Sequence, residues 1–125
     1  MGKTATDLYN EGYDLYEAGD HEGAIKLYTE AIEAEPSHPN LDRMYASRGY
    51  CRGLLQDPYG SIDDLSEAIQ LNPSNAHALS LRGGAYLMLQ EFDKASADLE
   101  EAYRLEPEKN GAKQFLEQLK IARGE

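Results

Sequence analysis

The chain has 125 residues, the size of a single domain, and a formal net charge of -11 at pH 7. Because nucleic acids and anionic membranes attract basic surfaces, this charge argues against either one as the main partner. The single cysteine, Cys51, excludes an intramolecular disulfide, and without a membrane-length apolar run or the apolar core of a signal peptide we expect a cytoplasmic protein.

Apolar residues recur at helical spacing along most of the chain, and no strand pattern competes with them. The spacing predicts six helices, over residues 5–18, 21–35, 40–55, 58–71, 75–89 and 92–105. Asp20 and Asp57 are suited to cap the second and fourth of these helices, and Pro58 suits a first turn. A seventh helix is predicted from one apolar stripe: Ala112, Phe115, Leu116, Leu119 and Ala122. The predicted fold class is therefore all-α.

A sequence repeat organises these helices. Pro73 and Pro107 lie 34 residues apart, each at the end of an apolar helix, and Pro36 ends another. When each of these prolines is numbered position 32, the repeats cover residues 5–38, 42–75 and 76–109. Small residues then recur at position 8 (Gly12, Gly49, Gly83), position 20 (Ala24, Ser61, Ala95) and position 27 (Ala31, Ala68, Ala102). Since small residues let two helices approach closely, each repeat is expected to form an antiparallel helix hairpin.

This pattern resembles the tetratricopeptide repeat, a 34-residue unit with Gly or Ala at position 8, Ala at 20 and 27, and Pro at 32. The resemblance implies a right-handed α-solenoid of three hairpins and a capping helix over 110–123, in one domain spanning residues 1–125. Arg48 and Arg82 depart from the usual Leu at position 7, and Arg52 departs from the usual Tyr at position 11. In the later repeats, certain positions of the first helix pack against the preceding repeat, and in the first repeat these positions are polar. A terminal repeat needs such a polar face, so we expect an array close to complete.

Arg at position 7 occurs together with Asp at position 23. Arg48 accompanies Asp64, and Arg82 accompanies Asp98, whereas the first repeat has neither residue type at these positions. The co-occurrence predicts a partly buried ion pair between helices, either within one repeat or from Arg82 back to Asp64.

The sequence offers no pattern for catalysis, metal binding or a cofactor. His21, His38 and His77 lie in separate segments, and none has a Cys or carboxylate partner at metal-ligand spacing. Cys51 takes position 10, usually a small packed residue, so we expect a buried structural thiol rather than a nucleophile. We therefore expect a non-enzymatic protein without a cofactor or metal.

In the tetratricopeptide repeat the first helix of each hairpin lines a concave inner wall, so the resemblance places a ligand there. An aromatic patch is expected on this wall, made by Tyr9, Tyr13, Tyr16 and Tyr50. Gly53 and Gly84 are expected to leave room beside the patch. The candidate peptide-binding residues are Tyr9, Tyr13, Tyr16, Arg43, Ser47, Tyr50, His77, Ser80, Leu81 and Gly84. Alternatively, tyrosines are simply common at these positions and carry no selected ligand.

Similar domains bind the acidic C-terminal tail of heat-shock chaperones through five Lys, Asn and Arg side chains. The residues here at those five positions are Tyr9, Tyr13, Ser47, His77 and Leu81, and none of them matches. We therefore expect a protein or peptide partner other than that tail. The wall favours an extended or helical peptide with apolar or aromatic anchors and a basic residue to meet Glu17.

Two hypotheses about function remain open at this point. The first is a monomeric or weakly self-associating interaction module that binds a peptide in the concave groove. The second is a structural or assembly scaffold, of idealised or engineered sequence, that self-associates through its end helices by way of Leu116 and Leu119.

Overall fold

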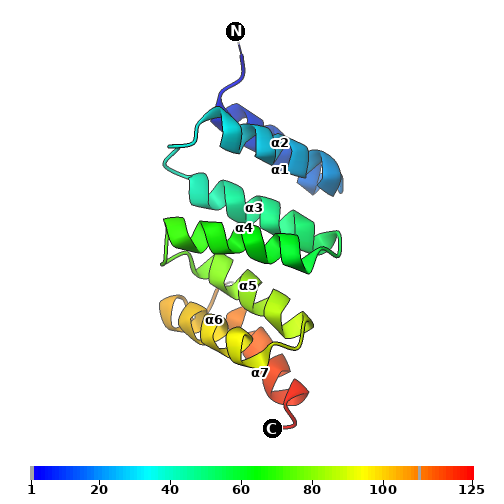
Figure 1. Ribbon diagram of the computed structural model, residues 1–125, viewed down its shortest axis with the longest axis vertical. Coiled ribbons are helices and arrows are strands. Elements are labelled where there is room, and N and C mark those ends of the chain that lie inside the picture. Colours follow the sequence, from blue (N-terminus) through cyan, green and yellow to red (C-terminus); the bar gives the residue numbers. More distant parts are fainter. Residues whose placement is uncertain (1, 110) are drawn as a thin grey trace.

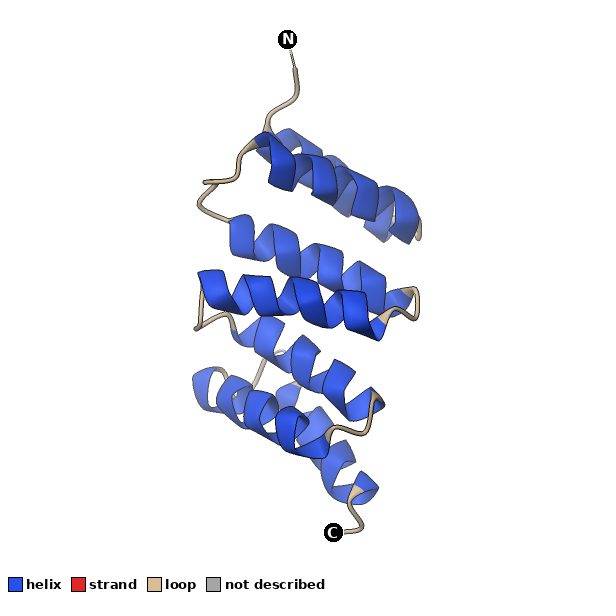
Figure 2. Cartoon of the chain, in the orientation of Figure 1, coloured by secondary structure: helices blue, strands red, loops and turns tan. Residues whose placement is uncertain are grey.

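The structure is a computed structural model that describes residues 2–109 and 111–125, and within them seven helices stack along one axis (Figure 1). The helices are α1 (Ala5–Glu17), α2 (His21–Ala34), α3 (Leu41–Leu54), α4 (Pro58–Leu71), α5 (Ala76–Met88), α6 (Phe92–Leu105) and α7 (Ala112–Ala122). Among the described residues the helices are joined only by loops, and no strand occurs (Figure 2). The prediction of an all-α repeat solenoid is confirmed.

Each helix begins and ends within two residues of its predicted bounds. Asp20 and Asp57 act as the predicted caps, because their carboxylates accept hydrogen bonds from the backbone N–H of Gly23 and Gly60 at 2.9 and 3.0 Å. The largest difference is at α7, which begins at Ala112 rather than at residue 110. Asn110 itself lies outside the described residues.

Within each hairpin the two helices touch at the glycine of position 8, as predicted. Gly12 faces the ring of Tyr28, and Gly49 faces Leu65. At Gly83 an added Cβ would lie 2.6 Å from Cγ of Leu99, closer than any side chain can tolerate. The pairs α1 with α2, α3 with α4 and α5 with α6 pack on each other, and α2–α3 and α4–α5 contacts join successive hairpins.

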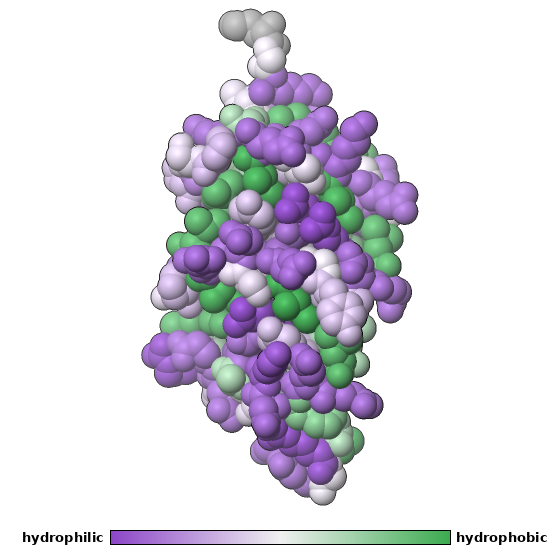
Figure 3. Space-filling view, in the orientation of Figure 1, coloured by the Kyte–Doolittle hydropathy of each residue, from purple (hydrophilic) through white to green (hydrophobic). Residues whose placement is uncertain are grey.

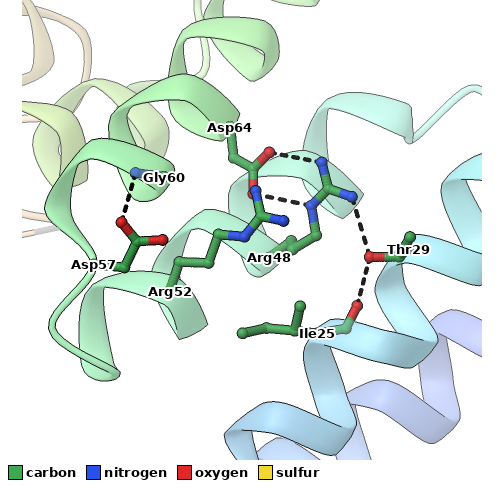
Figure 4. A network of polar contacts seen from close by, with 7 residues as sticks. All are labelled: Ile25, Thr29, Arg48, Arg52, Asp57, Gly60 and Asp64. Atoms are coloured by element: carbon green, nitrogen blue, oxygen red, sulfur yellow. Dashed lines mark hydrogen bonds and ion pairs between the residues drawn. The ribbon is translucent and has the colours of Figure 1, made fainter.

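A partly buried guanidinium joins three helices at each boundary between hairpins. Arg48 donates to both carboxylate oxygens of Asp64, at 2.9 and 2.7 Å, and its third nitrogen donates to the Thr29 hydroxyl at 3.1 Å (Figure 4). Asp64 belongs to the same hairpin, whereas Thr29 lies on α2 of the preceding one. The side chain therefore fixes both the hairpin and its stacking on the hairpin before it.

The same contact recurs one hairpin later. Arg82 donates to both oxygens of Asp98, at 2.7 and 2.8 Å, and to the Ser66 hydroxyl of the preceding hairpin at 3.1 Å. The predicted ion pair within each repeat is confirmed. The alternative partner, Asp64 for Arg82, is wrong, because Asp64 is paired with Arg48 and Arg52, and Arg82 donates to the hydroxyl of Ser66 on α4 instead.

Arg52 explains why position 11 departs from the family pattern. Its Nη1 donates to Asp64 Oδ2 at 3.0 Å, so two arginines share one carboxylate that is only 3% exposed (Figure 4). Hydrogen bonding to Asp64 is the main cause that raises the pKa of the Arg48 guanidinium above its usual value, against the opposing effect of burial.

The two ends of the stack differ in polarity. In the first hairpin Glu11 stands where later hairpins have Arg, and it pairs with Lys3 at the surface. At the other end α7 packs on α6 and α5, with Leu119 buried against the cluster of Ala95 and Leu99. Leu119 is therefore not available for the predicted self-association, because the residue is only 3% exposed within the chain, whereas Leu116 is partly buried.

The face turned towards the viewer in Figure 1, on which α2, α4 and α6 lie in front, is mostly hydrophilic. Figure 3 shows hydrophobic side chains there in bands between the helices rather than as one broad patch. Single exposed apolar residues of this kind are normal for a protein surface.

Replacing Arg82 by Ala should lower the free energy of unfolding by about 3 kcal/mol, because Asp98 would be left buried without its cation. That figure is the low end of the range for buried pairs, since Arg82 retains 21% side-chain exposure. Urea denaturation measures it. Arg104→Ala is the matched control, because Arg104 pairs with Glu101 at the surface and its loss should leave the stability almost unchanged. Equal losses in the two variants would contradict the buried-pair account.

Candidate functional site

Four of the hollows in the described residues lie along the face made by the first helices of the hairpins, α1, α3 and α5. A small one, of about 190 Å³, lies at the beginning of α1 and α3, and the other three are larger. The polar pocket, of about 420 Å³, is lined chiefly by Tyr9, Asp42, Arg43, Ser47, Asn72, Asn75, His77 and Glu106. The tyrosine pocket, of about 290 Å³, is lined by Tyr9, Tyr13, Tyr16, Tyr28, Ser47, Tyr50, Cys51 and His77. The apolar pocket, of about 260 Å³, is lined chiefly by Tyr50, Gly53, Leu54, Leu81, Gly84, Leu87, Met88, Phe115 and Gln118. Shared residues make the three hollows neighbours on one face.

Tyr16 is the centre of the tyrosine pocket. Its ring centroid lies 5.9 Å from that of Tyr13 and 5.8 Å from that of Tyr50, which comes from the next hairpin. These are the separations at which aromatic pairs are stabilised by tilted or edge-to-face geometry. A hydrogen bond with Tyr50 is the main cause that raises the pKa of the Tyr16 phenol. The aromatic patch predicted from the sequence is thus a connected cluster.

Tyr9 connects this cluster to the second hairpin through a hydrogen bond. Its hydroxyl lies 2.8 Å from Ser47 Oγ, and its ring packs 5.2 Å from the ring of Tyr28. Because Tyr9 and Ser47 are 38 residues apart, the contact exists only when α1 and α3 lie side by side. The wall of the pocket therefore depends on the stacking of the hairpins.

Buried groups form the floor of the tyrosine pocket. Tyr28 and Cys51 are each only 1% exposed. Burial raises the pKa of the Cys51 thiol to about 11, and it also raises the pKa of the Tyr28 phenol. Both groups are therefore uncharged near neutral pH, and the buried structural thiol expected from the sequence is confirmed.

One tyrosine of the tyrosine pocket has a carboxylate beside it. Glu17 ends α1, and its hydrogen bond with Tyr13 is the first cause that raises the pKa of that phenol. The last turn of α1 contains no basic residue to offset the partial negative charge of a helix C-terminus.

The polar pocket lies at the beginning of α3 and α5. Asp42 accepts hydrogen bonds from the side-chain amides of Asn72 and Asn75, at 3.2 and 3.0 Å, which ties α3 to the loop before α5. Arg43 is exposed beside them. His77 also lies on the exposed wall, but neighbouring atoms exclude part of its water and lower the pKa of its imidazole, so it is neutral at pH 7.

The apolar pocket depends on a residue that sequence reasoning did not assign to the wall. Gly84 was expected to leave open room, but that space is filled by the ring of Phe115 from α7, 2.9 Å from where a Cβ would stand. The available signal was the apolar stripe of α7, which was interpreted only as a cap. Phe115 is therefore a lining residue that the sequence reasoning missed, and it stands beside Leu54 and Met88 of the wall helices, of which Met88 is 64% exposed.

Ser80 does not lie on the open wall. It was predicted as a ligand-contacting residue, yet it is completely buried. The reason is that position 5 is buried where a preceding hairpin covers it, since Ala46 at the same position of the second repeat is 4% exposed. The other nine candidate residues line one or more of the three pockets.

Other kinds of site are not visible in the part of the chain that the structure describes. Within residues 2–109 and 111–125, no three or more His, Cys, Asp or Glu side chains gather where they could hold a metal ion. Over the same residues, no helix combines the length and the apolar character needed to span a bilayer.

Stacked hairpins whose first helices line a groove define the class of helical-repeat domains. Within that class the chain belongs to the tetratricopeptide repeat family, which it matches over residues 5–38 and 55–110.

Natural proteins are among the relatives of the chain. Heat shock protein STI1 of Saccharomyces cerevisiae is 30% identical over 119 residues, which are 95% of this chain and 20% of that protein. FK506-binding protein-like of Rattus norvegicus is 28% identical over 117 residues, covering 90% of this chain and 34% of that protein. The chain thus spans about a fifth to a third of the length of these two relatives. An engineered or idealised scaffold is not supported by these matches.

Two similar solved structures hold peptides. The first repeat domain of Spaghetti (RPAP3), bound to the HSP90 peptide SRMEEVD, is 27% identical with a TM-score of 0.90, covering 98% of this chain and 94% of that one. The second repeat domain of human RPAP3, in complex with the HSP70 peptide SGPTIEEVD, is 28% identical with a TM-score of 0.84, covering 93% and 94%. The expectation that excluded the chaperone tail conflicts with these complexes of relatives.

The buried Cys51 should be almost inert in the native protein. With a pKa of about 11, about one thiol in a thousand is ionised at pH 8, and the side chain is only 1% exposed. Ellman's reagent should therefore react slowly with the native protein and rapidly after denaturation in urea. Rapid and stoichiometric labelling of the native protein would show that the floor of the tyrosine pocket is open.

Proposed function

We propose that the chain is a non-catalytic interaction module that binds a peptide segment of a partner protein along the face made by α1, α3 and α5. The observation that carries this proposal is the continuity of the groove. The polar and tyrosine pockets share Tyr9, Ser47 and His77, and the tyrosine and apolar pockets share Tyr50. A ligand longer than one side chain could therefore occupy all three.

The chemistry of the groove favours binding over catalysis. Tyrosines supply a large contact area at low cost in conformational entropy, and they provide hydroxyls for hydrogen bonds. Cys51 is protonated and buried, so it is not a ready nucleophile. A free, buried thiol also fits the reducing conditions of the cytoplasm, where we expect the protein to act.

The relatives support a peptide as the kind of ligand. Domains of the same fold hold the peptides SRMEEVD and SGPTIEEVD, at 27% and 28% identity to this chain. These two acidic peptides are therefore the first ligands to test. Tyr9, Tyr13, Ser47, His77 and Leu81 replace the Lys, Asn and Arg side chains that similar domains use, so the two peptides are tested beside a library of unbiased sequence.

Peptide binding should be lost when Tyr9, Tyr13 and Tyr50 are replaced together by Ala. Each side chain lines the tyrosine pocket, and buried tyrosines at interfaces commonly contribute about 2 kcal/mol or more, so a loss of about 30-fold or more is expected. Fluorescence anisotropy with the two acidic peptides and with peptides selected from a displayed library measures the affinity.

The matched control is Tyr59→Ala, because Tyr59 lies on α4, is 69% exposed and lines none of these pockets. Its affinity for each peptide should equal that of the unchanged protein. The proposal would be wrong if no peptide bound, or if the triple variant, folded by circular dichroism, bound as tightly as the control.

A further inference from the structure

The tyrosine pocket has the electronic character of a site for a cation. The faces of aromatic rings carry negative charge, and a cation is attracted when it lies within about 6 Å of a ring centroid. Tyr13, Tyr16 and Tyr50 follow one another at 5.9 and 5.8 Å, so a single group in the pocket can meet more than one ring. Tyr13 is 47% exposed, which leaves its ring accessible from solvent.

The charged groups near the tyrosine pocket also favour a cation over an anion. Glu17 forms a hydrogen bond with Tyr13, which lines the pocket, and the C-terminal turn of α1 has no basic residue. His77, which lines the other side, is neutral at pH 7. No Lys or Arg is among the residues that line this pocket.

The arginines of the neighbouring helix do not supply the missing cation. Arg48 and Arg52 on α3 both point to Asp64, on the side of α3 that packs against α4 (Figure 4). Arg43 lines the polar pocket, which adjoins the tyrosine pocket at Tyr9. Among the described residues, the lining of the tyrosine pocket thus offers rings, with the Glu17 carboxylate beside Tyr13, and no cation of its own.

The neighbouring apolar pocket suits an apolar side chain rather than a charged one. It is continuous with the tyrosine pocket at Tyr50, and its walls are Leu54, Leu81, Met88 and Phe115 from three helices. Leu54 and Met88 are 41% and 64% exposed, so covering them with an apolar group would remove unfavourable contact with water.

We propose that the tyrosine pocket binds a lysine or arginine side chain of a partner peptide, while the adjacent apolar pocket binds an aliphatic or aromatic side chain of the same peptide. The proposal rests on the peptide-binding function proposed above and names the ligand chemistry of that groove. A peptide that carries a basic residue near an apolar one also complements the overall charge of -11.

The test begins with selection of binding peptides from a displayed random library against the whole chain. Enriched sequences should contain Lys or Arg at a fixed spacing from an apolar residue. The tightest Lys-containing peptide is then synthesised in two forms, with Lys or with norleucine at that position, because norleucine keeps the aliphatic chain and removes the charge. The Lys form should bind roughly 2- to 30-fold more tightly.

Variants of the pocket distinguish recognition of a positive charge from non-specific apolar binding. Tyr13→Leu keeps apolar area but removes a ring, and Glu17→Gln removes the carboxylate. Each should reduce the affinity ratio between the Lys peptide and the norleucine peptide by roughly 2-fold or more, because only the Lys form loses an interaction with its charge. Tyr59→Leu, on the exposed surface of α4, is the matched control and should affect neither peptide.

The outcomes distinguish this proposal from the one on which it rests. Selected peptides without basic residues, or equal affinities for the Lys and norleucine forms, would overturn the cation site while leaving peptide binding intact. Selection of acidic peptides, or tight binding of SRMEEVD alone, would do the same. If nothing were enriched and neither acidic peptide bound, the proposed function itself would fail and the cation site with it.

Discussion

The buried contact between Arg and Asp at each hairpin boundary is the constraint on which the rest of the structure depends. Asp64 and Asp98 are almost fully buried, and a buried carboxylate is stable only when its oxygens are satisfied. Arg48 and Arg82 satisfy them and use their remaining nitrogen to reach a hydroxyl on the preceding hairpin. Since apolar packing alone is less directional, these contacts fix which residues of successive hairpins face each other.

Stacking in this register creates the groove. The tyrosines of α1 meet Tyr50 only because α3 lies beside α1, and Tyr50 adjoins Leu81 only because α5 lies beside α3. Each of the three pockets is lined by residues of more than one hairpin. The same geometry turns the arginines of α3 towards α4 and leaves the tyrosine pocket without a cation of its own. The stability of the fold and the proposed ligand specificity of the groove thus both follow from the way the hairpins stack.

Local pattern in the sequence was enough to predict the helices, the glycine contacts and the ion pairs, because each depends on spacing within one repeat. The sequence also contains a signal for the hydroxyl partners of the two arginines, which was not recognised. Thr29 and Ser66 both occupy position 25, in the repeat before Arg48 and Arg82 respectively. Ser80 and Phe115 could not be placed in this way. The burial of Ser80 depends on the hairpin stacked before it, and the contact of Phe115 with Gly84 depends on how α7 crosses α5. Neither is set by local periodicity.

The central claim is that the face made by α1, α3 and α5 receives a peptide. Backbone amide chemical shifts of the labelled protein, followed while a selected peptide is added, test it most directly because they locate the ligand without any substitution. The account predicts that the largest changes cluster on α1, α3, α5 and around Phe115, with little change at Tyr59 and Tyr103 on the second helices. Changes concentrated on α2, α4 and α6 would contradict it.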